Sequence, residues 1–201
     1  MEKAKQPNFI EKLRQNSLYW FLAQAIVMYV AYQAFEKFYL EKDRTLNSSL
    51  TQNIAEVSAW GLRGLGYDSY AAQKTFGGQV EDIIYINARQ TVYIEDGCNG
   101  LVLMAFFVIF IIAYPGPILK KLWYIPAGMF LIYIINVVRC MVLAVNILYN
   151  PSSFEFNHKY LYSTLIYIAI FGLWMLWANK LSGNSFNQLG NQNNTPEPDA
   201  R

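Results

Sequence analysis

A cysteine, an arginine and a histidine in this chain have the chemistry of a thiol-based acyl-transfer site. Cys98 lies where the polar segment 96–100 meets the apolar stretch 101–114. Arg139 lies inside a second apolar stretch, and His158, the only histidine, lies just before a third. A thiolate attacks carbonyl carbons well, and a neighbouring cation or histidine base can activate it. The three residues therefore predict a cysteine nucleophile at a membrane boundary.

Each of these residues also has a less reactive interpretation. Cys98 alone is compatible with an inert apolar cysteine, and His158 with a solvated loop histidine. Arg139 is harder to explain in this way. An arginine inside a spanning helix costs about 2.5–3.5 kcal/mol on insertion scales and usually faces the bundle interior. Its structural alternative is an arginine that only satisfies backbone carbonyls or extends to the interface.

Small and polar residues accompany the candidate nucleophile and the arginine. Gly100 permits a tight turn after Cys98 and Asn99, and the N–H groups that open the following helix could stabilise an oxyanion. Asn136 lies within an arc of about 80° with Arg139 and Asn146, which predicts a polar stripe that faces inward.

The histidine and the second cysteine have fewer supporting signals. A histidine pKa near 6.5 suits proton transfer at neutral pH, and Asn157, Glu155 or Asp96 could orient the ring of His158. Cys140 points about 100° away from Arg139 on the same helix, so we interpret it as a buried apolar residue.

Composition places these residues in a membrane protein. The 201 residues are 54% hydrophobic and only 15% charged, whereas about a quarter of the residues of a soluble domain are charged. A net charge of +2 without a dense basic patch argues against nucleic acid as a partner. One histidine and two distant cysteines match no metal spacing, so we expect no metal and no cofactor.

Four apolar stretches predict transmembrane helices at about 18–35, 99–115, 122–149 and 160–178. The second is short unless its first residues lie in the interfacial zone. The third would extend about 40 Å, so it must tilt or project from the bilayer. An A-x-A pattern at 23–25 suggests a cleaved signal peptide. However, only about five apolar residues precede it where about 7–15 are usual, so we expect a retained helix.

Short basic flanks predict the orientation of these helices. If four helices alternate, one side of the membrane holds Lys3, Lys5, Lys12, Arg14, Lys120, Lys121 and Lys180. The positive-inside rule makes this side, and both termini, cytoplasmic. Cys98 and His158 then lie at the outer ends of their helices. Arg139 lies about 15 Å below the outer end of the third helix.

The outer loop, 36–97, is predicted to be partly ordered. Spaced apolar residues over 48–65 indicate an amphipathic helix, and β-branched and aromatic runs at 83–86 and 91–94 indicate a β-hairpin with 87–90 as its turn. The polar tail 182–201 is predicted to be disordered. The expected fold is thus one membrane all-α domain over 1–181. It has about four transmembrane helices and a small extracytoplasmic insertion of one helix and one hairpin.

The order Gly97-Cys98-Asn99-Gly100, then Asn136 and Arg139 three residues apart, then His158, resembles the exosortase/archaeosortase family of membrane cysteine transpeptidases. The resemblance covers about 80–177. It implies that Cys98 is the nucleophile, that Arg139 and His158 are its catalytic partners, and that Asn99, Gly100, Asn136 and Asn157 support them.

The resemblance also implies a substrate and a location. Substrates would be exported proteins with a C-terminal sorting signal, made of a short motif, one transmembrane helix and a basic tail. The enzyme would be a multi-pass protein of a prokaryotic plasma or inner membrane, with membrane lipid around it and its site facing outside. Two alternatives remain open: a non-catalytic membrane subunit that binds partner helices, and a membrane thiol oxidoreductase.

Overall fold

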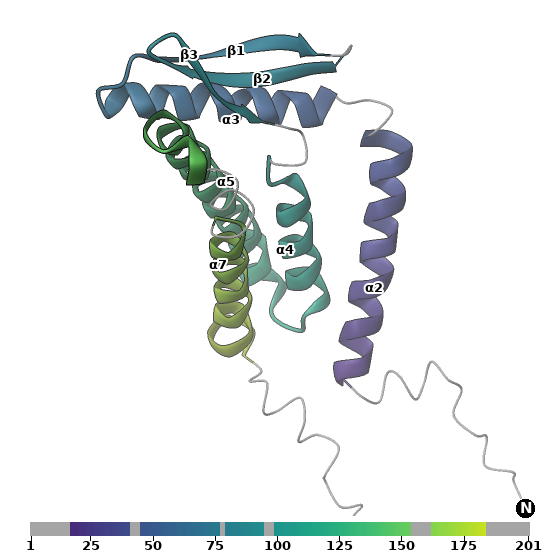
Figure 1. Ribbon diagram of the computed structural model, residues 1–201. Coiled ribbons are helices and arrows are strands. Elements are labelled where there is room, and N and C mark those ends of the chain that lie inside the picture. The colour runs from purple at the N-terminus through teal and green to yellow at the C-terminus, as the bar shows by residue number, and fades with distance from the viewer. Residues whose placement is uncertain (1–16, 41–44, 77–78, 95–98, 154–161, 184–201) are drawn as a thin grey trace, which may run out of the picture.

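The computed structural model describes residues 17–40, 45–76, 79–94, 99–153 and 162–183. These residues form a bundle of upright helices under a cap, which consists of one helix and a small sheet within 45–94 (Figure 1). The upright helices are α2 (Ser17–Phe35), α4 (Leu101–Ala113), α5 (Ile118–Tyr149) and α7 (Tyr162–Leu176). Helix α3 (Thr45–Gly64) lies across one end of the bundle, and a small sheet covers α3. Short helical segments continue three of these elements: Glu36–Leu40 after α2, Pro151–Ser153 after α5 and Trp177–Leu181 after α7.

Within the described ranges, three helices are long and apolar enough to cross a membrane: Leu18–Tyr39, Ile118–Tyr149 and Thr164–Leu181. The predicted second span is shorter than expected, because α4 has 13 residues and begins only after Gly100. At about 1.5 Å per residue it covers about 20 Å, against about 30 Å for a hydrocarbon core. The chain is thus a mostly helical membrane protein with three candidate spans, while a fourth crossing by α4 stays a prediction.

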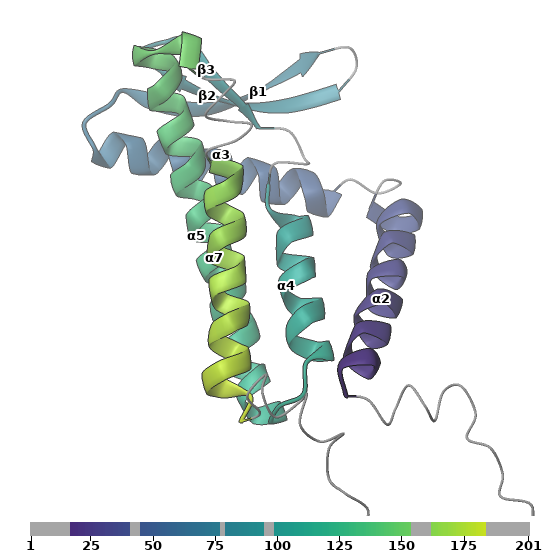
Figure 2. The same ribbon diagram turned by 60° about the horizontal axis from the view of Figure 1, so that its bottom comes forward.

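Helix α5 is part of the bundle and also packs against the cap. Its 32 residues extend for about 48 Å, and Figure 2 shows it rising past α3 to the level of the sheet. Its last turns pack in a hydrophobic cluster with α3 and the sheet, through Val137, Cys140, Leu143 and Ala144. A side-chain hydrogen bond with Tyr149, the last residue of α5, raises the pKa of Tyr67 above its ordinary value. The third stretch therefore projects from the bundle, and Arg139 lies at the junction with the cap.

Helix α3 confirms the predicted amphipathic helix. Its inward face repeats at helical spacing, and its buried residues are Thr51, Ile54, Ala55, Ser58, Ala59 and Leu62. The hydroxyl of Ser58 donates a hydrogen bond to the Val137 carbonyl of α5, at 3.3 Å. A Cβ on Gly61 would lie 2.9 Å from the Met141 sulfur, so the glycine lets the two helices approach closely.

The sheet contains the predicted hairpin and one additional strand. Strands β1 (Ser69–Phe76), β2 (Gln79–Ile86) and β3 (Arg89–Ile94) pair antiparallel in the order β1-β2-β3. The β2–β3 turn is two residues rather than the predicted four, because Asn87 and Ala88 both have positive φ, at 52° and 59°. The expected insertion of one helix and one hairpin is therefore extended by strand β1 to a three-stranded sheet. Strand β1 was not predicted, because it contains few β-branched residues. The Gly77-Gly78 pair that follows it in the sequence is nevertheless typical of a hairpin turn.

Two lysines close the end of the bundle opposite the cap. The ammonium of Lys121 donates hydrogen bonds to the carbonyls of Ile112 and Tyr114, at 2.9 and 2.7 Å. That of Lys120 donates to the Leu181 carbonyl at 3.1 Å. Both lysines thus cap helix C-termini, where a positive charge is favourable. Ser182, where the polar tail was expected to begin, is still buried against this end.

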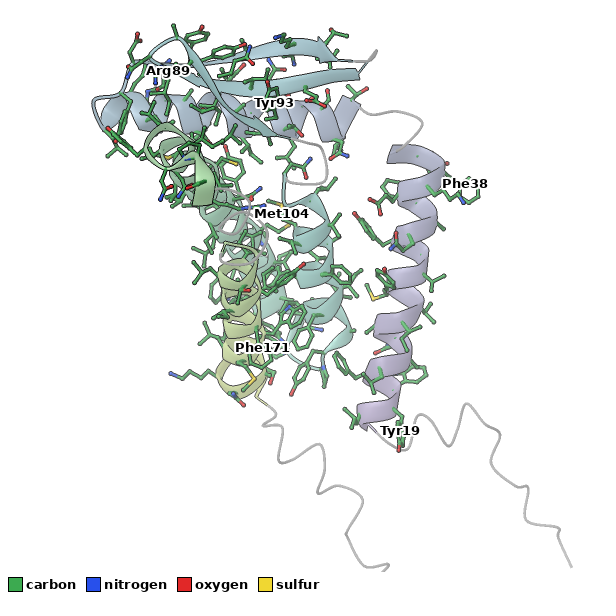
Figure 3. The ribbon with its side chains drawn as sticks, viewed as in Figure 1. Tyr19, Phe38, Arg89, Tyr93, Met104 and Phe171 are labelled. Atoms are coloured by element: carbon green, nitrogen blue, oxygen red, sulfur yellow. The ribbon has the colours of Figure 1, made fainter. Side chains whose placement is uncertain are left out.

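Helix α2 is attached to the bundle along α4. Ring contacts join Phe21 to Phe110, with centroids 5.4 Å apart, and Tyr29 to Phe106, at 5.2 Å. No α2 side chain that the structure describes is buried. In Figure 3, Phe38 points away from the bundle just beyond the end of α2. This helix therefore presents most of its apolar surface outward, as expected for a helix in contact with lipid.

Candidate active site

The described residues form one wall of the predicted site. Asn99, Gly100, Asn136 and Arg139 are all described, and they come from the turn before α4 and from α5. Cys98, His158 and Asn157 lie outside the described residues, so their predicted roles stay predictions. The wall can nevertheless be built from its contacts, because the turn that carries Asn99 and Gly100 is held from two sides.

The first side is α3, which binds the side chain of Asn99. This side chain is 1% exposed, and its amide nitrogen donates to the side-chain oxygen of Asn47, to the Asn47 carbonyl at 3.3 Å and to the Thr51 hydroxyl at 3.2 Å. Its amide oxygen accepts the N–H of Leu101 at 2.9 Å. Asn99 therefore ties the first residue of α4 to the N-terminal half of α3.

The second side is α5, which contacts Gly100. A Cβ at this position would lie 3.1 Å from the amide nitrogen of Asn136, and the glycine has φ +81°. Both the close approach and the left-handed backbone favour glycine here. The Gly100 carbonyl then accepts the N–H of Met104 at 2.9 Å, which is the first bond of α4. Figure 3 labels Met104 on the first turns of this helix.

The polar face of α5 is directed inward, as predicted. Asn136 is 1% exposed, whereas Arg139 and Asn146 are partly buried, so none of the three points freely to the surface. The Nε atom of Arg139 is itself buried. Residues three apart on a helix have Cβ atoms about 5–6 Å apart. A permanently charged guanidinium thus lies one turn from the residue that contacts Gly100.

Sequence reasoning missed the contribution of α3. Asn47 and Thr51 lie four residues apart and continue the inward face of the helix, ahead of Ile54 and Ser58. Polar residues on the buried face of an amphipathic helix are a signal for buried hydrogen bonds. That signal was available in the sequence, but it did not say which group the two residues would bind.

Cys140 is buried, as expected, within the cluster that joins α5 to the cap. Among the parts of the chain that the structure describes, no three His, Cys, Asp or Glu side chains are grouped to hold a metal ion. The expectation of chemistry without a metal or cofactor stays a prediction.

The family model for transmembrane exosortases (Exosortase_EpsH) matches residues 13–176. The chain belongs to this family. The match extends from before α2 to the last residue of α7, and it includes the Asn99-Gly100 turn and the polar face of α5. The predicted resemblance is thus confirmed at the level of the exosortase family. No curated protein and no solved structure matches the chain significantly.

Proposed function

We propose that this exosortase-family protein is a membrane cysteine transpeptidase with Cys98 as its nucleophile. The observation that carries the proposal is the contact of Gly100 with Asn136, one helical turn from Arg139. Cys98 precedes Gly100 by two residues in the sequence, so its thiol is attached to the chain close to a contact with the helix that bears the arginine. The proposed substrates are exported proteins whose C-terminal sorting signal holds a short motif, a transmembrane helix and a basic tail.

The reaction would proceed in two acyl transfers. The Cys98 thiolate attacks the carbonyl carbon of the scissile peptide bond, and the resulting C–N cleavage leaves a thioester. His158 takes the thiol proton and delivers it to the leaving amine. The nitrogen of an acceptor amine then attacks the thioester carbon and loses a proton to His158, which returns it to the departing sulfur. Asn157 would orient the imidazole.

Arg139 would stabilise the negative charge that develops on the carbonyl oxygen when the thiolate attacks the peptide bond and again when the amine attacks the thioester. Its charge persists at every physiological pH, and its partly buried position strengthens its electrostatic effect. The N-terminus of α4 would add a partial positive charge from its first N–H groups. Because the Leu101 N–H is bound to Asn99, the N–H groups of Val102 and Leu103 are the remaining candidates.

The two-layer fold supports an outward-facing site. The lysine-capped end of the bundle would be cytoplasmic, and the cap with its sheet would lie outside. A substrate helix beside the bundle would hold the scissile bond at a fixed depth, which supplies proximity. The cap would restrict water around the thioester, and this restriction would favour transfer to an amine over hydrolysis.

The decisive experiment compares the two cysteines. Cys98→Ala and Cys98→Ser should insert into membranes normally but leave full-length substrate precursor uncleaved, as measured by immunoblot of membrane fractions. Cys140→Ala is the matched control and should process substrate. Cleavage by Cys98→Ala would exclude Cys98 as the nucleophile. If Cys98→Ser is silent while Arg139→Ala disrupts assembly, the chain is instead a subunit that binds partner helices.

A further inference from the structure

We propose that Asn47 and Thr51 of α3 are positioning residues for the Cys98 thiol, acting through Asn99. This inference rests on the proposed function, and it assigns a role to a helix that contributes no reacting group. Asn47 and Thr51 bind the side chain of Asn99, which follows Cys98 directly in the sequence. They therefore fix the position of Asn99 relative to α3.

The hydrogen-bond directions in this cluster are mutually consistent. The Thr51 hydroxyl donates to the Asn47 carbonyl at 2.9 Å, so its lone pairs are left to accept from the amide nitrogen of Asn99. The amide oxygen of Asn99 accepts a hydrogen bond from a donor, the Leu101 N–H. A flipped amide would place oxygen against the Asn47 oxygens and nitrogen against an N–H. The network therefore selects one orientation of Asn99.

Burial makes this selection strong. Thr51 and Asn99 are each 1% exposed, so water cannot easily replace a lost partner. A buried donor or acceptor that loses its partner stays desolvated without a hydrogen bond, which is unfavourable. Removal of the Thr51 hydroxyl is therefore expected to loosen Asn99.

Helix α3 can serve as a rigid reference because it is itself fixed to α5. In addition to the Ser58 bond with the Val137 carbonyl, the Tyr133 hydroxyl donates to the Asn53 side chain at 2.6 Å. Both contacts lie on the two helical turns of α5 that precede Arg139. The turn before α4 is thus clamped between α3 and Asn136, and α3 sets the distance from the turn to the arginine helix.

The test measures the thiol itself. In a Cys140→Ala background, the full chain is purified in detergent, and the rate of Cys98 alkylation by iodoacetamide is recorded against pH. With the clamp intact, the alkylation midpoint should lie below that of a free cysteine, near 8.5. Thr51→Val and Asn47→Ala should move the midpoint toward the free value. Thr51→Ser, which keeps the hydroxyl, and Ser48→Ala, an exposed position of the same helix, should not.

Processing kinetics add a second readout. Thr51→Val should lower kcat by about tenfold to a hundredfold while KM stays close to that of the parent, because substrate binding is intact and the thiol is misplaced. An unchanged alkylation profile in Thr51→Val, or equal profiles for Val and Ser, would overturn the inference. Because alkylation needs no substrate, this outcome is distinct from failure of the proposed function, which appears as cleavage by Cys98→Ala.

Discussion

Two contacts between helices in this molecule depend on different kinds of interaction. The junction of α3, α5 and the turn before α4 relies on buried hydrogen bonds and on a glycine where no side chain fits. The contact of α2 with α4 relies on aromatic rings and leaves a groove of about 330 Å³ beside it, lined by side chains that include Trp20, Val27 and Ile112. Directional bonds fix positions, whereas apolar contacts tolerate sliding.

This difference shows where the molecule requires accurate geometry. A misplaced atom at the junction leaves a buried polar group unsatisfied, which costs about 1–3 kcal/mol. A shift of α2 exchanges one apolar neighbour for another, and lipid tails can fill the same role. Substitutions at the junction should therefore affect catalysis far more than substitutions on α2.

The largest effect is expected at Arg139. Under the proposed mechanism, Arg139→Ala should lower substrate processing by about a hundredfold or more, because it removes the charge that would stabilise the developing oxyanion. Arg139→Lys should restore only part of the activity, since a compact ammonium does not reproduce the guanidinium fork. Processing rates and size-exclusion profiles in detergent would be measured together. Arg89→Ala, an exposed change on the sheet (Figure 3), is the control and should behave as the parent.

A smaller effect is expected at Gly100. Gly100→Ala should destabilise the fold by about 1–2 kcal/mol, because an L-residue is strained at this positive φ. It should also lower processing by about tenfold, because the new Cβ pushes on Asn136. Thermal unfolding and processing would be compared with Gly172→Ala, where the added Cβ would lie more than 4 Å from every other described side chain and helix. Equal activity of the two variants would contradict the tight seat of the turn.

The smallest effect is expected on α2. Tyr29→Ala removes the ring stacked on Phe106 and should cost about 0.5–1.5 kcal/mol from that pair, with processing close to the parental rate. Processing and thermal unfolding in nanodiscs would check both values. A loss of activity as large as that of Gly100→Ala would show that α2 also fixes the geometry of the site.

The sequence predicted the elements better than their contacts. The apolar helices, the amphipathic helix and the hairpin follow from local periodicity, and each appears within a few residues of its expected bounds. The inward polar face of Asn136 and Arg139 also follows from helical spacing. The binding of Asn99 by Thr51 could not be predicted, because it joins residues far apart in sequence through a crossing of helices that no local pattern encodes. For the same reason, the length of α5 indicated that it must tilt or project, but it did not indicate that its end would pack against α3 and the sheet.

The adjacent lysines at the start of α5 have a consequence for topology mapping. Charge-reversal mutagenesis commonly replaces such residues to determine how a protein is oriented in the membrane. Here the same two ammonium groups fasten the carbonyl ends of two neighbouring helices. Replacing them with acids would both reverse the insertion signal and unfasten the bundle, so a reporter that changed sides could reflect either event. Arginine replacements, which keep the charge but alter the reach, would separate the two.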